Sequence, residues 1–228
     1  MPHDPVPVYG NTYYVGTSGL SAVLVTSPEG HVLIDGALNE SAPLIAANVE
    51  ALGFRVEDVE LILNSHAHFD HAGGIAALQR ASGAAVAASP SSAAVLAAGA
   101  PGPDDPQYAD LLPLPMAPVR PVRVLADGET VRVGPLALTA HFTPGHTAGG
   151  TTWTWTSCED GRCLDMVYAD SLTPISEEGY RFSQSDRYPS VLADFERSYA
   201  VLEGLPCDVL LAPHPGAAGR FERLDARA

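Results

Sequence analysis

The stretch from residue 66 to residue 71 constrains this chain more than any other, because it places three histidines and one aspartate within six positions. A short apolar run at residues 59–63 precedes it and is typical of a buried strand. Gly73 and Gly74 follow it and open a segment with helical spacing that ends near Gly83. The sequence therefore predicts that the cluster lies on a strand-to-helix loop, at the carboxyl end of the strand, where open α/β sheets bind their ligands.

The side chains of this cluster are of the types that bind metals. Imidazole suits zinc, and a carboxylate adds a harder oxygen ligand. His66 and His68 alternate along the chain, so in an extended segment they point the same way and can hold one metal. Asp70 and His71 are adjacent, so they project differently and can serve a second metal nearby. The ligand set favours zinc, with iron or manganese as open alternatives.

Two further histidines occupy the same kind of position. His146 lies in a turn with proline and glycine after the apolar segment 136–142, and His214 follows the apolar run 208–212. A histidine thus closes a predicted strand at three places, which indicates that the three groups share one site. His141 lies within a strand, and we expect it to be structural.

Composition narrows the class of protein. The chain has 228 residues, of which 46% are hydrophobic and 17% charged, so it is globular and long enough for one large domain or two small ones. Its formal net charge of −15 and its lack of a basic patch argue against a nucleic-acid partner. No apolar run of eighteen residues predicts a membrane span, and the first residues lack the pattern of a signal peptide.

Short apolar runs and turns predict two blocks of strands, each followed by helices. Residues 27–30 form a turn that makes the strands on either side an antiparallel hairpin. The expected strands are residues 11–15, 21–26, 31–35, 59–63, 84–88, 122–125, 129–133, 136–142, 151–156, 164–171 and 208–212. The expected helices are residues 41–54, 75–83, 91–98 and 189–203.

Several residues keep two interpretations. Asp35 ends a buried strand and is either a turn former or a second-shell acceptor that orients a metal-bound group. The loop 99–121 is rich in proline, glycine and aspartate, and loops of this length are often functional, so Gln107 and Tyr108 are either contacts of a ligand or solvated residues without a role in binding. Cys158 and Cys163 flank a turn-like insert and form either a small disulfide ring or two reduced thiols.

The motifs His-Ala-His-Phe-Asp-His, Thr-Pro-Gly-His-Thr, Tyr-Ala-Asp-Ser-Leu-Thr-Pro-Ile-Ser and Leu-Leu-Ala-Pro-His-Pro-Gly resemble those of the metallo-β-lactamase superfamily. The resemblance runs from Tyr9 to Gly216 and is strongest to the subclass B3 zinc β-lactamases. It implies an α/β (α+β) fold, a four-layer αβ/βα sandwich of two mixed β-sheets with external helices. The implied domain is a single one over residues 1–228, in two β-α halves of roughly 1–120 and 121–228.

The same resemblance implies the ligands and the chemistry. Two zinc ions per chain would share a bridging hydroxide that attacks the lactam amide of penicillins, cephalosporins and carbapenems, and Asp70 would orient that hydroxide. Such an activity would confer antibiotic resistance. The implied ligands are His66, His68 and His146 for the first zinc and Asp70, His71 and His214 for the second.

Ser171 and Thr173 would bind the substrate carboxylate, with turn capping as the alternative role, and Asp170 would act as a second-shell residue. The main rival is a glyoxalase-II-like thioesterase or lactonase, in which an aspartate near the position of Asp170 bridges the metals. The context of Asp170 and His214 favours the β-lactamase. A metal-binding but catalytically silent protein is a further alternative. The chain has no Gly-x-Ser-x-Gly motif to support a serine nucleophile.

The chain departs from the subclass at its two ends. Members usually carry a secretion signal, so we expect a periplasmic or secreted protein, and we expect a monomer that acts on a small-molecule substrate. Members also extend into a C-terminal helix that often carries a cysteine. Residues 220–224 could begin such a helix, which we expect to be truncated, and its loss would explain why Cys207 has no evident partner.

Overall fold

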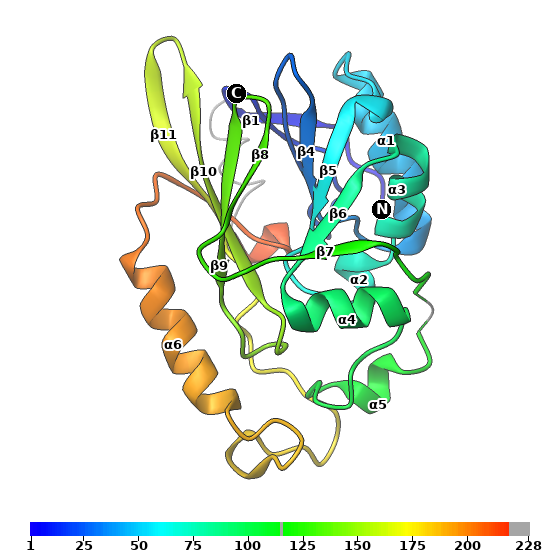
Figure 1. Ribbon diagram of the computed structural model, residues 1–228, viewed down its shortest axis with the longest axis vertical. Helices are drawn as coiled ribbons and strands as arrows, with labels where there is room; N and C mark the ends of the chain where they lie inside the picture. Colours follow the sequence, from blue (N-terminus) through cyan, green and yellow to red (C-terminus); the bar gives the residue numbers. More distant parts are fainter. Residues whose placement is uncertain (115, 219–228) are drawn as a thin grey trace.

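The computed structural model describes residues 1–114 and 116–218, in which two mixed β-sheets pack face to face with helices outside them (Figure 1). The larger sheet has seven strands, of which the first three neighbouring pairs are antiparallel and the last three are parallel. Its spatial order is β1 (Val6–Tyr9), β2 (Thr12–Tyr14), β3 (Val23–Val25), β4 (His31–Ile34), β5 (Val59–Leu63), β6 (Ala85–Ala88) and β7 (Val122–Val124).

The smaller sheet has five strands, all antiparallel except for the parallel pair at one edge. Its spatial order is β12 (Val209–Leu211), β11 (Arg162–Tyr168), β10 (Thr151–Glu159), β9 (Leu136–Phe142) and β8 (Thr130–Val133). The larger sheet is built from residues 6–124 and the smaller one from residues 130–211, so β7 belongs to the larger sheet although it follows the expected boundary between residues 120 and 121.

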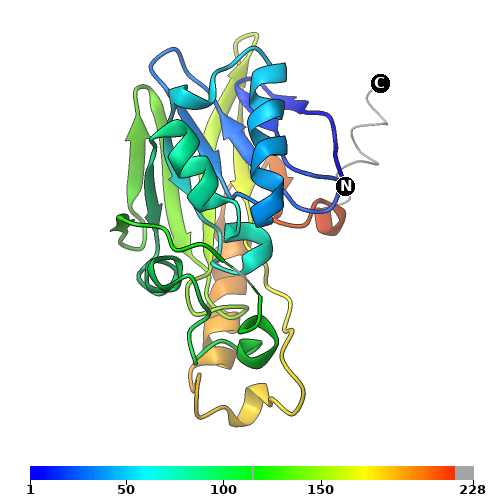
Figure 2. The same cartoon turned by 90° about the vertical axis from the view of Figure 1, so that its right-hand side faces the viewer.

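The helices lie outside the two sheets (Figures 1 and 2). The helices α1 (Ala42–Ala51), α3 (Ile75–Ser82) and α4 (Pro90–Ala98) lie on the larger sheet, and Figure 2 shows this layer from outside. The long helix α6 (Val191–Gly204) lies on the side of the smaller sheet (Figure 1). The arrangement confirms the expected αβ/βα sandwich. The short helices are α2 (Phe69–Ala72), α5 (Tyr108–Leu111), η1 (Asn39–Ser41), η2 (Val56–Asp58), η3 (Phe182–Gln184) and η4 (Pro215–Ala218).

Side chains of the larger sheet alternate between two cores, because successive residues of a strand face opposite sides. On β4, Val32 and Ile34 belong to the core between the sheets, whereas Leu33 packs in the core under the helices. On β10, Trp153 is fully buried between the sheets. Burying a large apolar side chain in this way contributes about 1.5–3 kcal/mol. The two cores therefore hold the strand ends that carry the site in a rigid frame.

Several details differ from the expectations. The strand β1 was not expected, because Pro7 lies within it; an edge strand tolerates a proline, which has no N–H to donate. The loop after β5 contains α2, and the loop 99–121 contains α5. The expected segment 220–224 lies outside the described residues.

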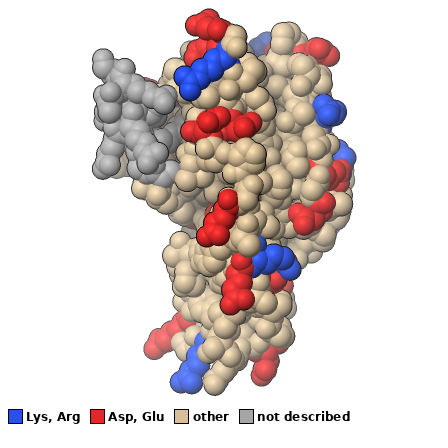
Figure 3. Space-filling model, turned by 90° about the vertical axis from the view of Figure 1, so that its left-hand side faces the viewer, with Lys and Arg blue, Asp and Glu red and all other residues tan. Residues whose placement is uncertain are grey.

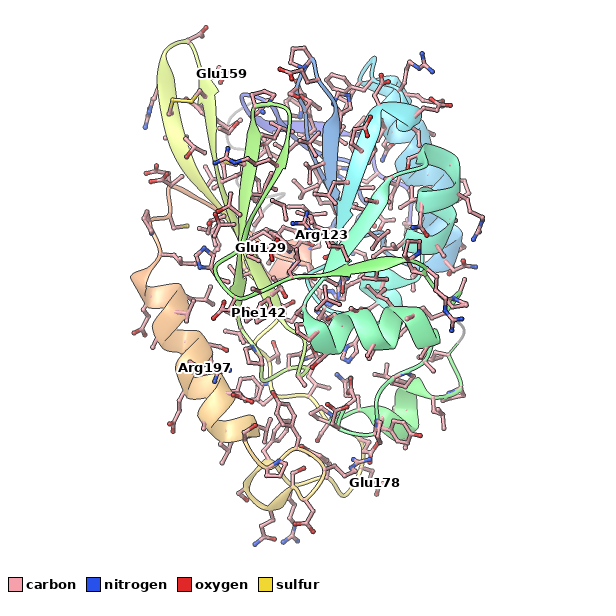
Figure 4. All side chains as sticks on the ribbon, viewed as in Figure 1. Arg123, Glu129, Phe142, Glu159, Glu178 and Arg197 are labelled. Carbon is pink, nitrogen blue, oxygen red and sulfur yellow. A yellow bond between two sulfur atoms is a disulfide. The ribbon has the colours of Figure 1, made fainter. Side chains whose placement is uncertain are left out.

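The hairpin of β10 and β11 is longer than expected, and Cys158 lies directly opposite Cys163 in it. Their sulfur atoms are 2.06 Å apart, at disulfide-bond distance, and Figure 4 shows the bond near Glu159. Cys207 is an exposed free cysteine.

The surface is acidic. Figure 3 shows carboxylates spread over the face that carries α6, with basic side chains scattered among them. The net charge of −15 agrees with this distribution. None of the helices in the described ranges is long and apolar enough to cross a membrane.

Candidate metal centre

Five imidazoles and one carboxylate meet where strands of both sheets end. His66 and His68 follow β5, and Asp70 and His71 lie in α2. His146 comes from the β9–β10 loop and His214 follows β12, so the second sheet contributes these two. The ring centroids lie 4.4 Å apart for His66 and His71, 4.7 Å for His66 and His68, 4.9 Å for His146 and each of His66 and His68, and 4.8 Å for His71 and His214. The structure therefore brings together all six residues that the sequence indicated.

The backbone around the first cluster is held from both sheets. The indole N–H of Trp153 donates to the carbonyl of Asn64, just before the histidine loop. The loop of His146 turns at Gly145, whose φ is +143°, and a Cβ there would lie 2.7 Å from the ring of Phe195 on α6. Glycine is therefore required for the β9–β10 loop to pack against α6 and carry His146 to the site.

His66, His68 and His146 form the first group, and each is buried. One potential ligand atom of each lies within 4.8 Å of those of the other two. The Nε2 atom of His66 has no hydrogen-bond partner among the described residues, although it is buried. Buried polar atoms are nearly always hydrogen-bonded, so an inward-facing nitrogen without a partner fits a place for a metal.

Each ring of this group is held by its other nitrogen. Such outer hydrogen bonds select the tautomer and orient the ring that binds a metal. His66 Nδ1 donates to Asp170 Oδ1 (2.7 Å), His68 Nε2 donates to Asp105 Oδ2 (2.8 Å), and His146 Nδ1 donates to the carbonyl oxygen of Thr173 (2.8 Å). These bonds leave Nε2 of His66, Nδ1 of His68 and Nε2 of His146 for a common ligand.

Asp70, His71 and His214 form the second group. The Nε2 atoms of the two histidines lie 3.2 Å apart, and Oδ2 of Asp70 lies 3.3 Å from that of His71 and 3.6 Å from that of His214. Tetrahedral zinc with ligands at 2.0–2.1 Å separates any two ligand atoms by about 3.3 Å. The triangle therefore has the dimensions of one face of a zinc site.

For four of these side chains, electrostatics favour the protonation states that a cation needs. Burial, followed by the neighbouring histidines, lowers the pKa of His66 well below its usual value and that of His146 to about 4. Burial and then His71 also lower the pKa of His214. For Asp70, burial acts to raise the pKa, but the hydrogen bond and charge of His71 outweigh it and hold the pKa below its usual range. Neutral imidazoles and an ionised carboxylate bind metals without first losing protons.

The two candidate second-shell carboxylates differ in position. Asp170 is fully buried and contacts the outer nitrogen of His66, and burial raises its pKa well above the usual value. Asp35 has a φ of +63° and accepts hydrogen bonds from Ser65 N and Oγ, from Asn64 Nδ2 and from the hydroxyl of Tyr168. Asp35 therefore holds the strand end that precedes His66, and Tyr168 links it to the other sheet.

The expected substrate residues lie at or next to residues that hold the histidines of the first group. Ser171 is half-buried, and the side chain of Thr173 is exposed while its carbonyl binds His146. The backbone N–H of Gln107 donates to Asp105 Oδ1, and its buried Nε2 has no partner among the described residues. His141 lies on β9, where its Nε2 is 2.9 Å from the hydroxyl of Thr154, so it is outside the cluster as expected.

Sequence reasoning missed Asp105. It lies in the loop 99–121 next to a second aspartate, and no pattern distinguishes the residue that reaches His68 from its neighbour. A cavity of about 270 Å³ lies beside this contact, lined by His68, Asp104, Asp105, Thr147 and the start of α4.

Comparison with known proteins gives one family. The model of the family described as "Metallo-beta-lactamase superfamily" matches residues 15–214. Among solved structures, the Rm3 metallo-beta-lactamase is 60% identical with a TM-score of 0.96, over 98% of this chain and 82% of its own. MEM-A1, a subclass B3 metallo-beta-lactamase from a soil metagenome library, is 53% identical with a TM-score of 0.97, over 99% and 85%. MIM-1 from Novosphingobium pentaromativorans is 46% identical with a TM-score of 0.94, over 100% and 82%.

Proposed function

Because the chain belongs to the metallo-β-lactamase superfamily, we propose that it binds two zinc ions and hydrolyses penicillins, cephalosporins and carbapenems, which would confer resistance to them. It is a metal-dependent β-lactam hydrolase, as its solved neighbours of 46–60% identity are metallo-β-lactamases. The observation that carries the two-ion proposal is the triangle of Asp70, His71 and His214 beside the buried group of three histidines.

The residues of both groups fit zinc. Three neutral imidazoles would hold the first ion, and two imidazoles with one carboxylate would hold the second, which are ligand types and numbers that catalytic zinc sites use. When bound, zinc lowers the pKa of coordinated water toward neutrality and polarises a carbonyl oxygen. The donors proposed for the first ion are His66, His68 and His146, and those for the second are Asp70, His71 and His214.

The protein's own groups contribute orientation. Asp170, Asp105 and the carbonyl of Thr173 hold the three rings of the first group in one tautomer and one direction. Asp70 is ionised, and its side chain is 22% exposed, so one carboxylate oxygen can accept a hydrogen bond from the attacking water and orient it toward the lactam carbonyl. The amide bond then breaks and water supplies the proton that the lactam nitrogen takes.

Ser171 and Thr173 are proposed to hold the substrate carboxylate by their hydroxyls, because both follow β11 and the carbonyl of Thr173 contacts His146. Gln107 is proposed as a further donor, because its buried amide nitrogen has no partner among the described residues. Asp170 is proposed as an orienting residue rather than a metal bridge, since its Oδ1 is engaged with the outer nitrogen of His66.

The cysteine pair supports a compartment. Disulfides persist in oxidising compartments, so the proximity of Cys158 and Cys163 supports a periplasmic or secreted location. We also propose that the protein is a monomer.

A substrate panel tests the proposal. The purified protein is assayed with a chromogenic cephalosporin, a penicillin, a carbapenem, a thioester and a lactone, first with zinc and then with a chelator. Lactam hydrolysis that the chelator abolishes is expected. Turnover of the thioester or lactone without lactam hydrolysis would contradict the proposal and favour the thioesterase or lactonase alternative.

A further inference from the structure

Two loops from different halves of the chain supply the outer hydrogen bonds of two histidines in the first group. Asp105 on the loop 99–121 binds His68, and the carbonyl of Thr173 on the loop 169–190 binds His146. Figures 1 and 2 show these loops side by side at the lower end of the molecule, beyond both sheets. The orientation of the two rings therefore depends on how the loops are held together.

Glu177 joins the two loops. Its backbone N–H donates to the carbonyl of Pro106 (2.9 Å), the residue directly after Asp105. Its Oε2 accepts from the backbone N–H of Ala109 in α5 (2.5 Å), and its Oε1 pairs with Nη2 of Arg187 (2.6 Å). A residue that lies four positions after Thr173 is thus bonded to the segment that carries Asp105.

The contacts of Glu177 suit a positional role. Ala109 lies in the first turn of α5, whose N–H groups have no partner within the helix, and a carboxylate there makes a charge-assisted hydrogen bond. Arg187 lies over the rings of Tyr108 and Tyr180, with its Cζ 5.9 Å and 5.4 Å from their centroids. The Glu177 side chain is 15% exposed. The ion pair alone adds little stability at such a surface, so what this network supplies is the relative position of the loops.

We propose that Glu177 is a positioning residue of the first metal site: it ties the two loops together and so holds Asp105 and the Thr173 carbonyl against their histidines. The proposal rests on the proposed function, since it takes His66, His68 and His146 as ligands of one metal.

The second group does not depend on the contacts of Glu177. In the described residues, the ion pairs and side-chain hydrogen bonds of Asp70, His71 and His214 run among themselves and, for His214, to the backbone of Gly19, and none of them runs to either loop. Loss of Glu177 should therefore weaken one metal site and leave the other unchanged, which a general loss of stability would not do.

The test measures zinc affinity of the metal-free protein against a competing chelator. Glu177→Ala removes both side-chain contacts, and Glu177→Gln keeps an oxygen that can accept from Ala109. The matched control is Glu178→Ala, since Glu178, labelled in Figure 4, is exposed and makes no hydrogen bond or ion pair among the described residues. Each variant is also made with His214→Ala, which isolates the first site, and with His146→Ala, which isolates the second.

The expected result is a first-site affinity about three- to tenfold lower for Glu177→Ala, less than the 10–100-fold typical of losing a direct outer contact. Glu177→Gln should lie between Glu177→Ala and the unmodified protein, and Glu178→Ala should match the unmodified protein. Equal weakening of both sites, or no change in the first, would overturn the proposal. An unmodified protein that binds fewer than two zinc ions would overturn the proposed function itself. If Glu177→Ala does not fold, Glu177→Gln and Arg187→Met decide by the same comparison.

Discussion

Nδ1 of His66 lies 2.7 Å from Oδ1 of Asp170, and both side chains are fully inaccessible to solvent. The carboxylate lies on the side of the ring away from Nε2, which has no hydrogen-bond partner in the part of the chain that the structure describes. An aspartate that contacts the outer nitrogen of a histidine orients a metal ligand, whereas an aspartate that bridges two metals is itself a ligand. Zinc affinity and zinc stoichiometry distinguish these two roles.

Asp170→Asn keeps the size of the side chain but replaces the carboxyl group that contacts Nδ1 of His66 with an amide. We expect zinc affinity to fall by about 10–100-fold while two zinc ions still bind at saturation, because no ligand is lost. Competition with a chelator measures the affinity, and elemental analysis measures the stoichiometry. Asp105→Asn is the matched variant, since Asp105 makes the same contact with His68. A fall to fewer than two ions at saturating zinc in Asp170→Asn would instead identify Asp170 as a bridging ligand.

His214→Ala should remove one of the two metals. The side chain is 49% exposed, so its truncation leaves no buried cavity, but the second group loses a donor that lies 3.2 Å from His71. Bound zinc is expected to fall from two ions to one per chain, with lactam hydrolysis lower by about 10²-fold, as on loss of one electrostatic stabiliser of a transition state. Elemental analysis and initial rates measure the two effects. His141→Ala, which lies outside the cluster, should retain both ions; an equal loss there would speak against the assignment.

In the metal-free protein, the contribution of His146 to stability should fall as the pH falls from 7 to 5. The folded-state pKa of His146 is lowered from 6.5 to about 4, so between these values the unfolded chain binds the proton and the folded chain does not. The stabilisation is present above pH 6.5 and is lost as the pH falls, by about 2 kcal/mol at pH 5 for this one group. Buried Asp35 and Asp170 have raised pKa values and act in the opposite direction. The measurement is therefore the difference in urea unfolding between the unmodified protein and His146→Gln. A difference that does not change with pH would contradict the account.

His31→Leu should stabilise the fold without affecting the metal site. His31 is buried in β4, packs edge-on against Phe54, and neither of its ring nitrogens has a hydrogen-bond partner among the described residues. An unsatisfied buried polar group costs about 1–3 kcal/mol, and an apolar side chain of similar size avoids this cost. Urea unfolding should show a gain of about 1 kcal/mol or more, with zinc content unchanged. A loss of stability would mean that the ring makes a contact through water or through a residue outside the described ranges.

Much of the fold could be predicted because its signals are local. The apolar run before His66 predicts a buried strand, and the turn at residues 27–30 predicts a hairpin. The structure has both, as β5 and as the antiparallel pair of β3 and β4. The six residues of the two metal groups could be proposed because histidine recurs at strand ends, which the sheets bring to one edge. Asp105 could not be found, since its role depends on how the loop 99–121 folds back over His68, and the sequence does not distinguish it from the adjacent Asp104. The strand β1 was not predicted because it contains Pro7. The contacts of Glu177 join two loops that are far apart in the sequence, so no local pattern predicts them.

The central claim is tested most directly by adding zinc to the metal-free protein while bound zinc and hydrolysis of a chromogenic cephalosporin are measured in the same samples. The account predicts that bound zinc reaches two ions per chain and that lactam hydrolysis rises with it and stops rising at that point. Saturation at two ions without lactam hydrolysis, or full activity without bound metal, would contradict it.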